Sequence, residues 1–106
     1  MLENKFQSKL IKEIKERFPR AVVLKNDPKY IQGFPDLLVL YFGTWFALEC
    51  KKNKTAKRQP NQKYYISMLN EMAHAAVVYP ENKEDVLHAM EKAFGARRKT
   101  CLSRSK

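Results

Sequence analysis

Two carboxylates that could hold a metal ion lie on one predicted β-hairpin, together with a lysine. Asp36 opens the apolar run 36–42, and Glu49 and Lys51 lie at the end of a second run that begins at residue 45. Gly43–Thr44 between the runs is typical of a two-residue hairpin loop.

In the register that this loop fixes, Asp36 faces Lys51. Side chains alternate along a strand, so all three charged residues share one face. Asp36 and Glu49 become diagonal neighbours with Cα atoms roughly 7–8 Å apart, a separation at which both can reach one cation.

The opposite face of the hairpin is apolar, so we expect the hairpin to be covered on both sides. A buried carboxylate pair costs free energy unless it is paired with a cation or bound to a metal. A purely structural ion pair, Lys51 with Asp36 or Glu49, is therefore the alternative to a metal site. The apolar face consists of Leu37, Val39, Tyr41, Phe46, Leu48 and Cys50.

The remaining elements follow from periodicity and from Pro and Gly punctuation. They run in the order α-β-β-β-α-β-α, which predicts an α/β fold with a small mixed β-sheet flanked by helices. We predict a single domain over residues 1–95 and a basic, disordered tail over 96–106. The predicted elements are a helix over 3–18, a strand over 21–26, a loop over 27–35, the hairpin, a helix from Pro60 to about Ala75 with Tyr65, Met68, Leu69 and Met72 buried, a strand over 75–79, and a helix capped by Asn82 that ends at Gly95.

Two polar residues lie on the inward sides of predicted helices. Glu3 lies on the core-facing line of the first helix, and Gln62 shares a stripe with Ile66 and Leu69. Glu3 could instead complement the helix dipole as a first-turn acid. A buried Gln62 amide needs a partner, such as a phosphate, a water or a metal-site carboxylate, whereas a capping or surface role needs none.

The charge balance favours a polyanionic partner. The chain has 106 residues, with 21 Lys and Arg against 11 Asp and Glu, for a net charge of +10. A merely basic protein of ribosomal type would show the same balance. Segment 51–63 has six basic residues and no acid, which predicts phosphate contacts, although a solvated loop is the simpler interpretation. The expected DNA-binding residues are Lys25, Lys29, Lys52, Lys54, Lys57, Arg58 and Lys63.

Other classes of site lack support in the sequence. Cys50 and Cys101 suggest neither a disulfide framework nor a zinc site, and His74 and His88, on separate predicted helices, have no metal-ligand spacing. No nucleotide-binding glycine motif is present, so no small-molecule cofactor is expected. We expect no signal peptide, no membrane association and a cytoplasmic location.

Four motifs in order resemble the PD-(D/E)XK nuclease superfamily, and most closely its VRR-NUC and phage Holliday-junction-resolvase branch. They are Glu3 at the start of the first helix, Gly33 to Asp36 as G-x-P-D, Glu49 to Lys51 as E-x-K, and Asn61-Gln62 opening the next helix. The resemblance covers roughly residues 1–94. It implies a restriction-endonuclease-like core. The middle residue of E-x-K is Cys50 rather than the commoner aliphatic residue, and it points away from the predicted site.

The resemblance also implies roles for these residues. Asp36 and Glu49 would ligate Mg²⁺, for which Mn²⁺ would substitute, with the Cys50 backbone carbonyl and Glu3 as further ligands. Lys51 would orient the attacking water and stabilise charge on the phosphate. Gln62 would support the site or contact the scissile phosphate.

The implied activity is Mg²⁺-dependent, structure-specific DNA endonuclease activity. A Holliday junction resolvase that acts as a homodimer on four-way junctions fits best, in a host cytoplasm if the chain is phage-encoded. The alternatives are a less selective nicking or flap nuclease, a restriction-type nuclease, or a non-catalytic nuclease-fold module that binds DNA. A small RNA-binding domain is disfavoured because the strands lack exposed aromatic pairs for base stacking.

Overall fold

The computed structural model describes residues 3–27, 29–57 and 60–104, with side chains described for 4–27, 29–57 and 61–95. It confirms the predicted element order and the small mixed sheet flanked by helices. The elements are α1 (Glu3–Arg17), β1 (Val22–Lys25), β2 (Leu37–Tyr41), β3 (Thr44–Cys50), α2 (Pro60–Met72), β4 (His74–Val78), the 3₁₀ turn η1 (Pro80–Asn82) and α3 (Lys83–Arg104).

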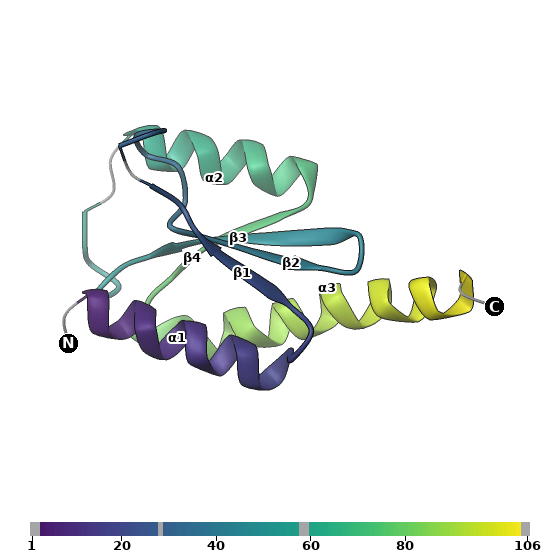
Figure 1. Ribbon diagram of the computed structural model, residues 1–106. Coiled ribbons are helices and arrows are strands. Elements are labelled where there is room, and N and C mark those ends of the chain that lie inside the picture. Colours follow the sequence, from purple (N-terminus) through teal and green to yellow (C-terminus); the bar gives the residue numbers. More distant parts are fainter. Residues whose placement is uncertain (1–2, 28, 58–59, 105–106) are drawn as a thin grey trace.

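The helices form two layers around the sheet, with α2 on one face and α1 and α3 on the other (Figure 1). On the face shared by α1 and α3, Leu37, Val39 and Leu48 are fully buried against Leu10 and Phe94. On the α2 face a smaller cluster joins Ala47, Leu69 and Ala75. The hairpin is therefore covered on both sides, as its two apolar faces predict.

The strand order β1-β2-β3-β4 places the hairpin in the middle of the sheet. β1 pairs antiparallel with β2, β2 antiparallel with β3, and β3 parallel with β4. The parallel pairing needs a crossover, which α2 supplies. It carries the chain back so that β4 ends beside the end of β3, with Glu49 opposite Val77 and Cys50 opposite Val78.

The hairpin loop lies one residue earlier than predicted. β2 ends at Tyr41 and β3 begins at Thr44, so the loop is Phe42–Gly43 and the expected Gly43–Thr44 loop is wrong. Both loop residues have positive φ, 41° for Phe42 and 80° for Gly43. This is the backbone of a type I′ turn, whose twist matches that of the flanking strands. Each residue of β2 consequently faces a partner two positions earlier than expected, and because the shift is even, every side chain keeps its predicted face.

Three expectations around the second helix are wrong. α2 ends at Met72 rather than near Ala75, and Met72 is 66% exposed rather than buried. The Asn70 side chain accepts the N–H of Ala75 at 3.1 Å, a local bond that turns the chain out of the helix. His74 therefore begins β4, where its ring stacks on Phe46, instead of lying on a helix.

Asn82 does not cap the last helix as predicted. Its side-chain oxygen accepts the N–H of Tyr79 at 2.8 Å, and its amide donates to the Val77 carbonyl at 3.0 Å. These two bonds close the turn between β4 and α3. The Asn82 side chain therefore bonds to the end of β4 instead of to the first N–H groups of α3, which begins at Lys83.

The last helix does not end at Gly95. α3 continues to Arg104, so most of the segment that was predicted to be disordered has a helical backbone. Gly95 is absent from the glycines with positive φ, the conformation that a helix-ending glycine adopts. Among the described residues, no helix is long and apolar enough to cross a membrane.

Gly95→Ala should stabilise the protein by about 0.5–1 kcal/mol, because alanine is the better residue in a helix interior. A Cβ at this position meets nothing within 4 Å. Gly43→Ala is the matched comparison and should destabilise by roughly 1–2 kcal/mol, since Gly43 has a φ of 80°. Urea unfolding of both variants measures these changes, and a destabilised Gly95→Ala would show that α3 ends at this glycine.

Candidate active site

Asp36 and Glu49 lie beside each other at one end of the hairpin. β2 and β3 pair Leu37 with Leu48, and the next pair in this register is Asp36 with Glu49. The Cys50 N–H donates to Asp36 Oδ2 at 2.9 Å. Continued by one residue, the register sets the two carboxylates opposite each other on the α2 face, whereas the predicted loop made them diagonal neighbours.

The main chain at Asp36 is held from the β1 side. The Asp36 carbonyl accepts the N–H of Asn26 at 2.8 Å, and the Asn26 side-chain amide donates to the Pro35 carbonyl. These bonds continue the β1–β2 pairing beyond the ends of both strands. Asp36 is thus fixed by backbone bonds on one side and by its carboxylate bond to Cys50 on the other.

Glu49 is the only buried charged side chain among the described residues, with 2% of its surface exposed. Gln62 Nε2 donates to its Oε2 at 2.6 Å, and Lys51 Nζ lies 3.5 Å from the same oxygen. Lys51 is itself largely covered, with a side chain 12% exposed. The predicted inward direction of Gln62 is confirmed, and its amide donates to the Glu49 carboxylate, one of the partners proposed for it.

The loop before Asp36 packs against the start of α2. Gly33 has a φ of 87°, and a Cβ added there would clash with the Cβ of Asn61. Nearby, the rings of Phe34 and Tyr65 meet edge to face with centroids 5.2 Å apart. Two motifs that are distant in sequence, Gly33–Asp36 and Asn61–Gln62, are therefore in direct contact. This contact fixes the start of α2 so that Gln62 reaches Glu49.

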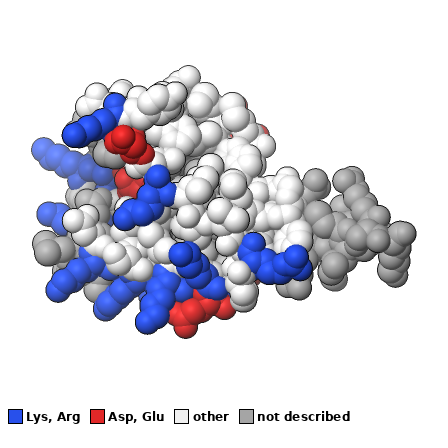
Figure 2. All heavy atoms as spheres, in the orientation of Figure 1, with Lys and Arg blue, Asp and Glu red and all other residues white. Residues whose placement is uncertain are grey.

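The surroundings of the site are basic. Figure 2 shows lysine and arginine side chains gathered on the side of the molecule where, in Figure 1, the loop between β3 and α2 lies. The predicted DNA-binding residues with described side chains are all exposed, while Arg58 lies outside the described residues. The exposed residues are Lys25, Lys29, Lys52, Lys54, Lys57 and Lys63.

Four of the five predicted catalytic residues come together here. Asp36 and Glu49 are linked through Cys50, and Glu49 contacts Lys51 and Gln62. The Cys50 side chain is buried in the opposite core, as its alternation predicts, and its carbonyl remains only a predicted ligand. Glu3 begins α1, but its side chain lies outside the described residues.

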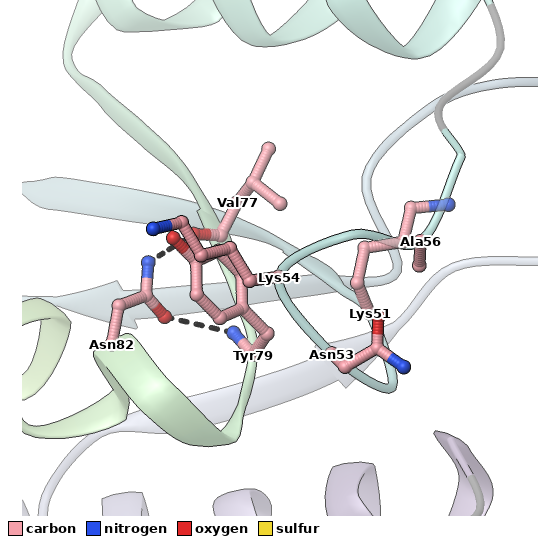
Figure 3. Close-up of a pocket in the computed structure, with 7 residues that line it drawn as sticks. All are labelled: Lys51, Asn53, Lys54, Ala56, Val77, Tyr79 and Asn82. Atoms are coloured by element: carbon pink, nitrogen blue, oxygen red, sulfur yellow. Dashed lines mark hydrogen bonds between the residues drawn. The ribbon is translucent and has the colours of Figure 1, made fainter.

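A hollow of about 310 Å³ lies between Lys51, the loop after β3 and the end of β4 (Figure 3). No local sequence pattern indicated this hollow, because β4 residues reach Lys51 only through parallel pairing with β3. The sequence feature that could have located the hollow is the alternation that places Val77 and Tyr79 on the same face as Glu49. The lining residues are Lys51, Asn53, Lys54, Ala56, Val77, Tyr79 and Asn82.

The donor set at the hairpin end fits Mg²⁺. This ion prefers oxygen ligands, keeps several waters, and is commonly held by one or two carboxylates together with substrate phosphates. Asp36 and Glu49 supply such a pair on one face of the sheet. Within the described part of the chain, no three His, Cys, Asp or Glu side chains cluster as a metal cage would require. A cation held by this pair would take its other ligands from water and substrate.

Comparison with known proteins identifies no relative. No protein-family model matches the chain, and neither a curated protein nor a solved structure matches it significantly.

Gly33→Ala should destabilise the protein by more than the roughly 1–2 kcal/mol of its left-handed backbone, because the new methyl group also collides with Asn61. Asn61→Gly removes that collision. The free energies of unfolding from urea titration of the two single variants and the double variant form a cycle. We expect the double variant to be more stable than the sum of the single changes. Simple additivity would contradict the close contact between the two motifs.

Proposed function

We propose that the chain is a metal-dependent DNA endonuclease that hydrolyses phosphodiester bonds with Mg²⁺. The observation that carries the proposal is the arrangement around Glu49, a carboxylate 2% exposed that lies next to Asp36 and contacts Lys51 and Gln62. These are residue types that hydrolysis of a phosphodiester requires, and they come from separate motifs. The resemblance to PD-(D/E)XK nucleases in the sequence supports the same assignment.

Asp36 and Glu49 would hold the cation. A bound Mg²⁺ supplies an acidified water at neutral pH and neutralises charge on the phosphate oxygens. The chain itself fixes the two carboxylates before any ligand arrives, since Asp36 is held by Cys50 and Glu49 by Gln62. Hydrogen bonds of this kind orient ligating carboxylates and are part of how a metal site is tuned.

Lys51 would stabilise the charge that develops on the phosphate. Its ammonium group is held 3.5 Å from Glu49 Oε2 and is only partly exposed, so its position is restricted before substrate binds. A fixed positive charge in a site with little water stabilises a developing oxyanion more strongly than a mobile surface lysine does. Lys51 is thus positioned to bridge the carboxylates and the scissile phosphate.

The basic surface supports DNA as the substrate. Exposed lysines of the loop after β3 and of the start of α2 would contact the phosphate backbone, which gives affinity without reading sequence. We propose branched DNA, and four-way junctions in particular, as the preferred substrate. Symmetric cutting of such a junction requires two copies of the site, so the proposal includes a homodimer. A linear duplex of matched sequence, compared with a junction, separates this activity from less selective nicking.

A non-catalytic DNA-binding module is the second candidate, and one observation favours it. The ion pair of Lys51 with Glu49 and the Gln62 hydrogen bond also form a network that stabilises buried charge without any metal. Metal uptake and cleavage separate the two candidates.

Glu49→Gln should reduce cleavage of a labelled four-way junction by at least about 100-fold, the scale on which an active site loses rate when one preorganised group is removed. Binding to the junction in EDTA should persist, because the substitution removes a negative charge beside Lys51. Cleavage rates with Mg²⁺ and binding by fluorescence anisotropy provide the two measurements. Glu71→Gln removes an exposed carboxylate from α2 and is the matched control. Wild-type cleavage by folded Glu49→Gln protein would show that Glu49 is not catalytic.

Mn²⁺ or Mg²⁺ uptake measured by calorimetry should depend on both hairpin carboxylates. Asp36→Asn and Glu49→Gln should each weaken binding at least about tenfold, the scale on which altered metal sites lose affinity. Glu71→Gln should bind the metal as wild type does. Equal uptake by all four proteins would place the metal elsewhere, and absence of uptake by the wild type would favour the non-catalytic module.

A further inference from the structure

We propose that the hollow beside Lys51, defined above by its lining residues, binds a second phosphate of the nucleic-acid strand, next to the phosphate at the carboxylates. The inference rests on the proposed function for the identity of the strand and extends it to a site lined by Lys51, the loop after β3 and the end of β4. An internal phosphodiester of the strand is the proposed occupant.

The position of the hollow follows from the strand order. Asp36 lies at the start of β2, Glu49 and Lys51 at the end of β3, and Val77 and Tyr79 at the end of β4. Pairing places Glu49 directly beside Val77, and alternation puts Lys51 and Tyr79 on the same face. A strand that crosses this end of the sheet from β2 toward β4 therefore passes the carboxylates, then Lys51, then the hollow.

The charge of the hollow suits an anion. Its lining includes two lysines, Lys51 and Lys54, and no acidic residue. Lys51 also borders the Glu49 carboxylate, so it stands between the two positions. Lys54 is exposed, and its side chain extends from the loop after β3 toward Tyr79 and Asn82 (Figure 3). A phosphate here would meet positive charge from the loop side.

Neutral side chains complete the lining. Asn53 Oδ1 accepts the N–H and the hydroxyl of Thr55, both at 3.0 Å, which leaves the amide NH₂ as the group of this side chain that can donate to a ligand. Tyr79 contributes a phenol, which can donate to a phosphate oxygen. Asn82 fixes the opposite wall through its bonds to Tyr79 and Val77. These bonds hold the Asn82 side chain against the backbone at the end of β4, whereas the Lys54 side chain is exposed.

The test measures DNA binding in EDTA, so that it does not depend on cleavage. The affinity for a four-way junction is determined by anisotropy over a series of salt concentrations. Lys54→Gln should lower the slope of log affinity against log salt by about one, the loss of one phosphate contact. Tyr79→Phe should weaken binding about two- to tenfold and leave the slope unchanged, because the hydroxyl is neutral. Lys92→Gln removes an equal charge from the exposed side of α3 and should keep the wild-type slope.

The outcomes are distinct. Equal slopes for Lys54→Gln, Lys92→Gln and wild type overturn the proposal, as does an absence of measurable DNA binding by the wild type. Removing the terminal 5′-phosphates from the junction should leave the effect of Lys54→Gln intact, and its disappearance would assign the hollow to a strand end instead. A changed slope in a protein that never cleaves with Mg²⁺ would sustain the phosphate site and refute the nuclease.

Discussion

The structure depends on the burial of one charged carboxylate. Glu49 lies at the end of β3 with 2% of its surface exposed, and a charge removed from water to that extent must be compensated. Compensation comes from Lys51 on the same strand end and from Gln62 on α2. A protein of this size could fill the position with an apolar residue at lower cost. A buried carboxylate beside a second one is the arrangement on which the proposed cation site depends.

The fold supplies the partners of Glu49 by three separate routes. The hairpin places Asp36 across from it, and the backbone bonds from Asn26 hold Asp36 in line. The close approach of Gly33 to Asn61 fixes the start of α2, from which Gln62 reaches inward. Parallel pairing brings the end of β4 to the other side of Lys51. One end of the sheet thus gathers residues from β2, β3, β4 and α2.

Much of this arrangement could be predicted from sequence because it rests on the alternation of side chains between the two faces of a strand. The predicted hairpin loop was displaced by one residue, yet the partners moved by two, so Asp36, Glu49 and Lys51 kept their common face. The inward direction of Gln62 followed from helical spacing alone. The positive φ of Phe42 was not predictable, because bulky residues seldom adopt it.

The remaining differences have tertiary or side-chain causes. His74 was predicted on a helix but lies on β4, because it pairs with Phe46 of β3. α2 ends where the Asn70 side chain bonds to the Ala75 N–H, a bond that hydrophobic periodicity does not specify. Asn82 was expected to cap α3, but its amide instead closes the turn after β4. Gly95 was expected to end α3, yet the helix-forming residues after it continue the helix. The hollow beside Lys51 depends on the crossover that pairs β4 with β3, and such pairing is invisible to local periodicity.

The position at which a divalent cation binds tests most directly whether Asp36 and Glu49 form the metal site. Mn²⁺ broadens the NMR signals of nearby nuclei, so it can be titrated at substoichiometric amounts into isotope-labelled protein. We predict that the Cys50 backbone amide and the Gln62 side-chain amide broaden first, since they donate to Asp36 and Glu49, and that EDTA restores both signals. Broadening centred on the exposed acids of α3, Glu84 and Glu91, with Cys50 and Gln62 unaffected, would contradict it.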